Sequence, residues 1–321
     1  MASTVPIDPV LSNLSVATWQ DAKGFIADKV FPTVPVEVQS GQYYVLDDAN
    51  LNRDTAERRA DASESAGDSF VLSDDAYNAT VFALHKDVGD QLQSNYKNVP
   101  GTPFQSASKF LVNKMRLRQE VQFAADFMAA GVWGLDEEGV SVSPSTDEFL
   151  QWNVSGSDPI ADVERWKEQV SAAGFDANVM AIGKPLWTAL KNHPDIIDRY
   201  KYTSGGAKVS LEAIADLFDL ERIVVGRAIR NTAKRGQPAT NVSVIGNSAL
   251  LVYTPDAPGI EVPAAGYTFA WTGVSEGLGE NIGTKQFRME SLAADRVESQ
   301  IALDNKLVAA SLGVFATNVV G

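Results

Sequence analysis

The chain has 321 residues, of which 45% are hydrophobic and 21% are charged, so it can build a sizeable core and more than one domain. Its formal net charge of -14 argues against a surface that grips phosphate backbones, but not against a chain that merely encloses nucleic acid. It contains no cysteine, which excludes disulfides, thiolate nucleophiles and zinc–thiolate sites. There is no secretory signal pattern and no apolar run near the roughly 20 residues that span a bilayer, so we expect a soluble protein made in the cytoplasm.

The first part of the chain is expected to be extended. Residues 1 to about 36 combine scattered hydrophobic residues with several prolines, a pattern typical of an arm that is ordered only by contact with something else. Two strand-like runs follow, VEVQSGQYYVLD and DSFVLSDDAYNATVFAL. Between them, Asn52 to Ser69 contains no aromatic or large aliphatic residue. The sequence therefore predicts a two-stranded ribbon with a charged tip.

The tip has two interpretations. It is either a disordered acidic loop or a segment that pairs with the charges of other subunits. Arginine suits the second role better than lysine, because its guanidinium can bind a carboxylate through two hydrogen bonds. Strands of about ten to twelve residues at ~3.3 Å each would reach about 35–40 Å, and an isolated ribbon is marginally stable in water. We favour the contact between subunits. The candidate contact residues are Arg53, Asp54, Glu57, Arg58, Arg59, Asp61 and Glu64.

A long helix gives the clearest local signal. After a short helix predicted for HKDVGDQLQSNY, a helix should run from Pro103 to about Ala130, with Thr102 as its N-cap. At ~1.5 Å per residue it would be about 42 Å long, which suits a structural spine. Its predicted apolar face comprises Phe110, Leu117, Val121, Ala124 and Met128.

From Asp158 onward, helices and strands alternate. Asp158 is a predicted N-cap, followed by the strand NVMAIG, the helix KPLWTALKNHP ending at Pro194, the helix SLEAIADLF and the strand RIVVG. After the loop NTAKRGQPATN, three more strands are expected in VSVIG, ALLVY and YTFAW. The order favours a compact α/β unit. The segment around Val297 to Leu303 predicts a long strand pair near the C-terminus.

The search for reactive groups yields little. His85 could act as a base paired with Asp87, but no nucleophile motif accompanies it, and a surface role is favoured. His193 stands at a helix end. Adjacent acids at 47–48, 74–75 and 137–138 lack the spacing of a calcium loop, and no phosphate-binding or dinucleotide-binding motif occurs. We predict no catalytic residue, no cofactor and no metal, so the chain should not be an enzyme.

The order of these segments resembles a known family. The chain is predicted to contain an arm, a ribbon, a spine helix, an α/β unit and a strand pair, in that order. This order resembles that of the major capsid proteins of tailed phages with the Hong Kong 97 fold. The amino-acid sequence itself also resembles that family in several segments. They are GFIADKVFPTVPVEVQSGQYYVLDD, FALHKDVGDQ, KFLVNKMRLRQEVQFAADFM with GVWG, SDPIADVERWKEQV and AGYTFAWTG. The resemblance covers essentially the whole chain, and the expected fold is therefore α+β of this type.

The resemblance implies a division of the chain. It assigns 1–36 to an N-terminal arm, 37–84 to an E-loop, 85–157 and 273–310 to a peripheral domain, and 158–272 with 311–321 to an axial domain. It also implies a homo-oligomer of hexamers and pentamers in an icosahedral virion shell around double-stranded DNA, assembled in the host cytoplasm. Portal, scaffolding and decoration proteins are the implied partners, with no membrane.

Two departures from the family bear on assembly. The type member links its subunits covalently through an E-loop lysine, whereas this chain has no lysine between Lys29 and Lys86, so that crosslink should be absent. Little chain precedes the E-loop, so scaffolding is expected to come from a separate protein. The alternative function is an encapsulin-type shell around a cargo enzyme, which shares the fold. A soluble α/β enzyme is the third possibility and would be a monomer or small oligomer.

Overall fold

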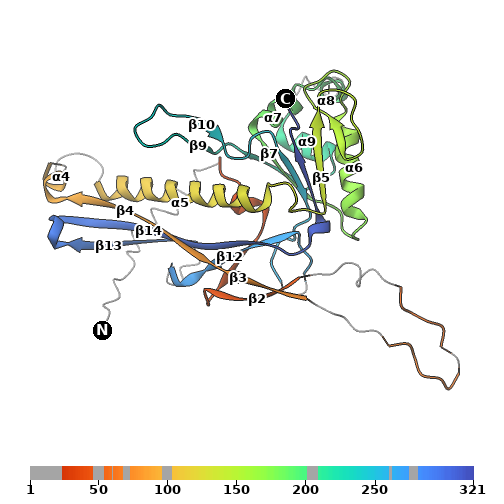
Figure 1. Cartoon of the computed structure of the whole chain (residues 1–321), viewed down its shortest axis with the longest axis horizontal. Helices are drawn as coiled ribbons and strands as arrows, with labels where there is room; N and C mark the ends of the chain where they lie inside the picture. The colour runs from red at the N-terminus through yellow and green to blue at the C-terminus, as the bar shows by residue number, and fades with distance from the viewer. Residues whose placement is uncertain are drawn as a thin grey trace.

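The computed structural model describes residues 24–45, 54–59, 61–67, 73–95, 103–200, 209–259, 262–274 and 281–321. These residues form an elongated α+β molecule with two main sheets (Figure 1). A five-stranded sheet runs along a long helix, and a six-stranded sheet with its own helices stands at the end of that helix. The predicted mixture of helix and sheet is confirmed. Residues 1–23 of the expected arm and Thr102 lie outside the described residues.

The five-stranded sheet is built around one long strand near the C-terminus. Strand β14 pairs with β4 along one edge and with β13 and then β12 along the other, always antiparallel. β1 adds to β12 in parallel. The predicted long strand pair is therefore β13 with β14. The strands are β1 (Thr33–Val36), β4 (Thr80–Gly89), β12 (Gly266–Trp271), β13 (Ile282–Met289) and β14 (Ala294–Leu307).

Helix α5 (Pro103–Phe127) forms the predicted spine, but it buries a different face. The buried row repeats every four residues through Ala107, Leu111, Met115, Gln119, Phe123 and Phe127. The sequence does not single out this face, because the opposite side also carries apolar residues such as Leu117 and Val121, and buried neighbours of the row such as Arg116 and Glu120 are polar. Phe110, placed in the core by the sequence, is 47% exposed and lies between Lys86 and Lys114, each with Nζ 5.6 Å from the ring centre.

The short helix predicted before the spine is only half helical. Helix α4 covers Asp90–Asn95, whereas the preceding residues from His85 to Gly89 continue strand β4. Val88 explains the difference, because it is buried in a cluster with Leu111 of the spine. Pairing with β14 thus extends the strand to Gly89.

The six-stranded sheet has the order β6-β5-β15-β11-β7-β8, with β15 and β11 in its centre. Its strands are β5 (Leu135–Val140), β6 (Glu148–Leu150), β7 (Val179–Gly183), β8 (Arg222–Gly226), β11 (Ala249–Val252) and β15 (Gly313–Thr317). The helices packed with it are α6 (Pro159–Ser171), α7 (Lys184–Lys191), α8 (Pro194–Tyr200) and α9 (Leu211–Leu217). Asp158 is the N-cap of α6, as predicted, and its Oδ1 accepts from the backbone N–H groups of Ile160 and Ala161.

Three segments differ from the expected layout. β5 and β6, expected in the peripheral segment 85–157, belong to the six-stranded sheet, whereas β12, expected in the axial segment 158–272, pairs with β14 in the other sheet. These differences arise because sheet partners are chosen by long-range pairing that local sequence does not encode. Pro194 begins helix α8 rather than only ending α7, since proline also suits a first helical position.

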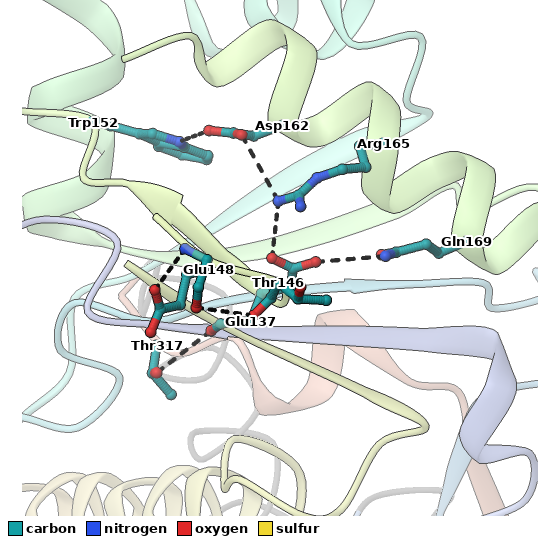
Figure 2. Close-up of polar contacts among 9 residues, drawn as sticks. Glu137, Thr146, Glu148, Trp152, Asp162, Arg165, Gln169 and Thr317 are labelled. Carbon is teal, nitrogen blue, oxygen red and sulfur yellow. Dashed lines mark hydrogen bonds and ion pairs between the residues drawn. The ribbon is translucent and has the colours of Figure 1, made fainter. Parts of the chain in front are cut away.

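The buried carboxylate of Glu137 on β5 joins helix α6 to the six-stranded sheet (Figure 2). Arg165 Nη2 on α6 donates to Glu137 Oε2 on β5 at 2.8 Å, and the Trp152 indole N–H donates to Asp162 Oδ2 at 3.0 Å. Burial raises the pKa of Asp162 to about 6, against the opposing effects of the Trp152 hydrogen bond and the Arg165 charge. Because a buried charge is costly unless it is paired, these contacts fix the position of α6 on the sheet.

An aromatic cluster joins the N-terminal segment, the spine and the six-stranded sheet. The Phe31 ring lies 4.5 Å from Phe127 and 6.2 Å from both Phe123 and Trp133, measured between ring centres. Trp133 also donates from its indole N–H to the carbonyl of Phe127 at 2.6 Å. The same cluster includes Phe315 of β15. It is therefore one of the contacts that attach the described arm residues to the body.

Glu120 of the spine holds the neighbouring helix α2 (Ala27–Val30). Its buried Oε2 accepts from the backbone N–H groups of Ile26 and Ala27, both at 2.9 Å. Burial raises the pKa of this carboxyl to about 7, although the two backbone hydrogen bonds act to lower it. The group is therefore a proton-binding site inside the folded subunit.

This pKa predicts a pH-dependent stability. Between its ordinary pKa near 4.5 and about 7, Glu120 binds a proton in the folded chain that it has lost in the unfolded chain. The free energy of unfolding should therefore fall as the pH rises through this window, by up to about 3 kcal/mol, and level off above it. Glu120→Gln should flatten this dependence in urea unfolding of the subunit, whereas the exposed Glu164→Gln should not. Equal pH profiles for wild type and Glu120→Gln would contradict the assignment.

Candidate assembly surfaces

The predicted ribbon is formed by β2 (Ser40–Val45) and β3 (Ser73–Asn78), which pair in antiparallel register. The described ladder has six residues per strand, fewer than the predicted ten to twelve. At the body end the first run contributes Val36 to β1, and the second continues into β4, which pairs with β14, whereas 46–47 and 68–72 lie outside the described residues. In Figure 1 residues 54–59 and 61–67 lie away from both sheets. The ribbon therefore carries its tip clear of the subunit body.

The base of the ribbon is anchored by aromatic packing. Tyr77 stacks on Phe269 with ring centres 4.6 Å apart, and Tyr43 lies 5.3 Å from the same ring. The Tyr43 hydroxyl contacts Asp75 Oδ2 at 3.1 Å and the Leu307 carbonyl at 3.0 Å, and burial, with Asp75 close by, raises its pKa above the usual range. The direction in which the ribbon leaves the body is therefore fixed by side chains of β2, β3 and β12.

The predicted contact residues lie in the part of the segment beyond the ladder. Arg53 is outside the described residues, and the other six candidates are exposed. They are Asp54, Glu57, Arg58, Arg59, Asp61 and Glu64. Arg59 Nε donates to the Ser63 carbonyl at 2.6 Å, and Ala62 adopts a left-handed φ of 58°, so a local turn presents this group.

Two arginines on the body are held in ion pairs, whereas the charged side chains of the tip form none among the described residues. Arg288 and Arg296 bind Asp90 and Asp87 through two N–H groups each and lower the pKa of both carboxyls. Among the described residues, none of the six tip side chains forms an ion pair. The tip therefore offers both signs of charge to another molecule.

A second projection is a small hairpin of β9 (Ile229–Asn231) and β10 (Asn241–Ser243). The predicted loop NTAKRGQPATN connects its strands, and the predicted strand VSVIG overlaps β10, whereas β9 was not predicted. Asn231 Oδ1 closes the loop by accepting from the backbone N–H groups of Ala233 at 3.0 Å and Thr240 at 2.9 Å. Gly236 has a φ of 86°, which permits the turn. The asparagine and glycine in NTAKRGQPATN were the available signals for this hairpin.

His85, which the sequence suggested as a possible base, is not paired with Asp87 in the structure. His85 is exposed on β4 opposite Glu298, and the Asp87 carboxylate, its candidate partner, is instead bound by Arg296 at 2.7 Å. The exposure and pairing agree with a surface role for this residue.

A contact that sequence reasoning missed joins His193 to Ser157. Ser157 Oγ lies 3.1 Å from His193 Nε2, and both side chains are buried. However, His193 Nδ1 accepts from the Asp195 backbone N–H at 3.3 Å, so Nε2 of the neutral ring carries the proton and donates to Ser157. Ser157 in turn donates to the Val154 carbonyl at 2.8 Å. A ring with this tautomer cannot take the serine proton, and the contact holds the start of α8 in place.

The described residues contain no cluster of three or more side chains that could hold a metal ion. The acidic pair at 47–48 lies outside them, and the pairs at 74–75 and 137–138 lie on β3 and β5. None of the described helices has the length and apolar composition that a membrane span requires.

The chain is similar to capsid proteins in sequence. Residues 106–226 match the family described as phage major capsid protein E. The major capsid protein of Pseudomonas phage JBD67 is 26% identical over 98% of this chain and 97% of its own length. That of Burkholderia phage BcepMu is 26% identical over 70% of this chain and 69% of its own length.

Solved structures share the fold. A phage-related protein from Bordetella bronchiseptica superposes with a TM-score of 0.74 at 22% identity, covering 99% of both chains. The capsid of cyanophage P-SCSP1u gives a TM-score of 0.57 at 11% identity, over 92% of this chain and 88% of that one. The SrpI encapsulin of Synechococcus elongatus gives a TM-score of 0.55 at 11% identity, over 100% of this chain and 93% of that one. The resemblance noted in the sequence is confirmed: the chain has the Hong Kong 97-type fold and is similar in sequence to phage major capsid proteins.

Proposed function

We propose that this chain is a phage major capsid protein that assembles into an icosahedral head shell around double-stranded DNA. The single observation that carries the proposal is the similarity along 98% of the chain to a phage major capsid protein. The unpaired charges on the projecting ribbon tip support it, since they suit a subunit that is completed by its neighbours. The role is structural, and no chemical step is assigned to the chain.

The proposed division of the subunit follows the two sheets. Residues 1–36 are the N-terminal arm, and the ribbon with its tip is the E-loop. The five-stranded sheet, to which the end of the arm adds β1, forms the peripheral domain together with α5. The six-stranded sheet with its helices is the axial domain, which surrounds the five-fold and six-fold axes. A net charge of -14 accords with a shell whose inner surface does not trap DNA.

Electron microscopy of the purified protein tests the proposal. Closed shells, rings or tubes are the expected result, and a monodisperse monomer under every assembly condition would contradict it. Particle content separates the phage capsid from the encapsulin-type shell, which the similarity to a solved encapsulin keeps as the second candidate. Nucleic-acid absorbance in native particles supports the capsid, whereas an enclosed enzyme supports the encapsulin.

The proposed partners follow from the same role. Other copies of the chain would form the hexamers and pentamers, and portal, scaffolding and decoration proteins would be separate chains in the virion. Expression of this chain alone tests the need for scaffolding. Aberrant or incomplete particles are expected, and uniform closed shells would argue that scaffolding is dispensable.

The shells should lack covalent links between subunits. Because no lysine occurs between Lys29 and Lys86, the E-loop has no amine for an isopeptide bond. Assembled particles heated in denaturing detergent should run as a single band near the 34.5 kDa of the monomer. A ladder of higher bands would contradict this expectation.

A further inference from the structure

The β9–β10 hairpin is an exposed element without a partner in the described chain. None of residues 229–242 is buried, and Ile229 and Val242 are 60% and 44% exposed. Figure 1 shows the hairpin projecting from the six-stranded sheet over the spine helix. Two short strands are marginally stable alone in water, yet the loop is held by its own hydrogen bonds. Such a preformed projection is suited to binding, because little ordering remains to be done.

The hairpin is basic within an acidic protein. Between Glu221 and Asp256 the sequence has five basic residues and no acidic one, although the whole chain carries a net charge of -14. Arg222 pairs with Glu221. Among the described residues the other four form no ion pair; they are Arg227, Arg230, Lys234 and Arg235. The surface therefore fits an acidic partner.

An acidic face lies on the opposite side of the same domain. On α6, the two cations are engaged with the subunit's own acids, Arg165 with Glu137 and Lys167 with Asp219. The charges left on the exposed side are Glu164 and Glu168, one helical turn apart and without an ion pair in the described chain. Figure 1 places α6 on the side of the six-stranded sheet away from the hairpin.

We propose that the hairpin of one subunit binds the α6 face of the next, with Lys234 and Arg235 against Glu164 and Glu168. The inference rests on the proposed shell function and names one contact within its rings. Complementary patches on opposite sides of one subunit make a head-to-tail contact, the kind from which rings are built when the rotation between neighbours closes. A second copy is favoured over DNA because Ile229 and Val242 add exposed apolar surface to the cations.

Charge reversal and its rescue test the pairing. Lys234→Glu/Arg235→Glu should stay folded, since both side chains are exposed, and should need a subunit concentration about tenfold higher or more to assemble. Adding Glu164→Lys/Glu168→Lys should restore assembly, whereas those two changes alone should impair it. A Lys234→Glu/Arg235→Glu variant that assembles at the wild-type concentration would overturn the inference but not the proposed function. A wild type that forms no oligomer would overturn both.

Crosslinking tests the geometry without relying on assembly yield. The chain has no cysteine, so Lys234→Cys/Glu168→Cys gives one defined pair for a bismaleimide. Assembled particles should then yield a ladder of linked subunits, and the matched pair Lys234→Cys/Glu298→Cys should not. Absence of the ladder would overturn the contact. If Lys234→Glu/Arg235→Glu shells formed normally and only their DNA content fell, the partner would be DNA and the inference would be wrong.

Discussion

Replacing Arg58 and Arg59 of the ribbon tip together with glutamate is expected to abolish shell assembly while leaving the subunit folded. Both side chains are exposed and form no ion pair in the described chain, and the one bond that Arg59 makes, to the Ser63 carbonyl, is confined to the tip, so the fold of the body does not depend on their charge. Across a subunit interface, reversing two charges turns attraction into repulsion, and the change recurs at every copy of the contact. Size-exclusion chromatography and electron microscopy of the variant would measure the loss.

The conservative pair Arg58→Lys/Arg59→Lys is the matched control. It keeps both charges but loses the bidentate geometry of the guanidinium, so assembly should fall only partly. Urea unfolding of both variants should agree with wild type within about 0.5 kcal/mol, as is usual for surface changes. Shells formed in normal yield and with normal stability by Arg58→Glu/Arg59→Glu would show that the tip is an ordinary loop.

Phe31→Ala is expected to produce the largest loss of subunit stability among these variants. Phe31 is 1% exposed and touches the rings of Phe123, Phe127 and Trp133, so its removal leaves a cavity where three parts of the chain meet. Truncation of a buried phenylalanine typically costs about 3–5 kcal/mol. The midpoint of urea unfolding should fall accordingly.

Phe110→Ala provides the comparison for that experiment. It removes the same side chain from a site that is 47% exposed on the outer face of the spine, and its cost should be below about 1 kcal/mol. Equal losses from the two substitutions would mean that the cluster around Phe31 does not hold the described N-terminal residues against the body.

Elements with strong local signals could be predicted from the sequence. The Asp158 cap, the β13–β14 pair and the ribbon were expected, because capping and alternation are properties of neighbouring residues. The buried face of α5 was not, since Arg116 and Glu120 on it are polar. The partners of β5 were also hidden, because its neighbour β15 begins at Gly313, far along the chain.

The candidate site likewise contains features that the sequence could predict and features that depend on the fold. Composition identified the charged tip, since a stretch without large apolar residues cannot be buried on its own. The basic hairpin was missed because its significance depends on the opposite charge of α6, which is distant in sequence. The contact between Ser157 and His193 likewise required the fold, and so did the hydrogen-bond directions that make it structural.

The place of β15 in the six-stranded sheet constrains the timing of biosynthesis. This strand lies between β5 and β11, and residues 313–317 are translated long after both of its neighbours. Until those residues leave the ribosome, the sheet has a gap at its middle and Phe315 is missing from the aromatic cluster. The domain can therefore be completed only after nearly the whole chain has been translated, so its folding is expected to be post-translational.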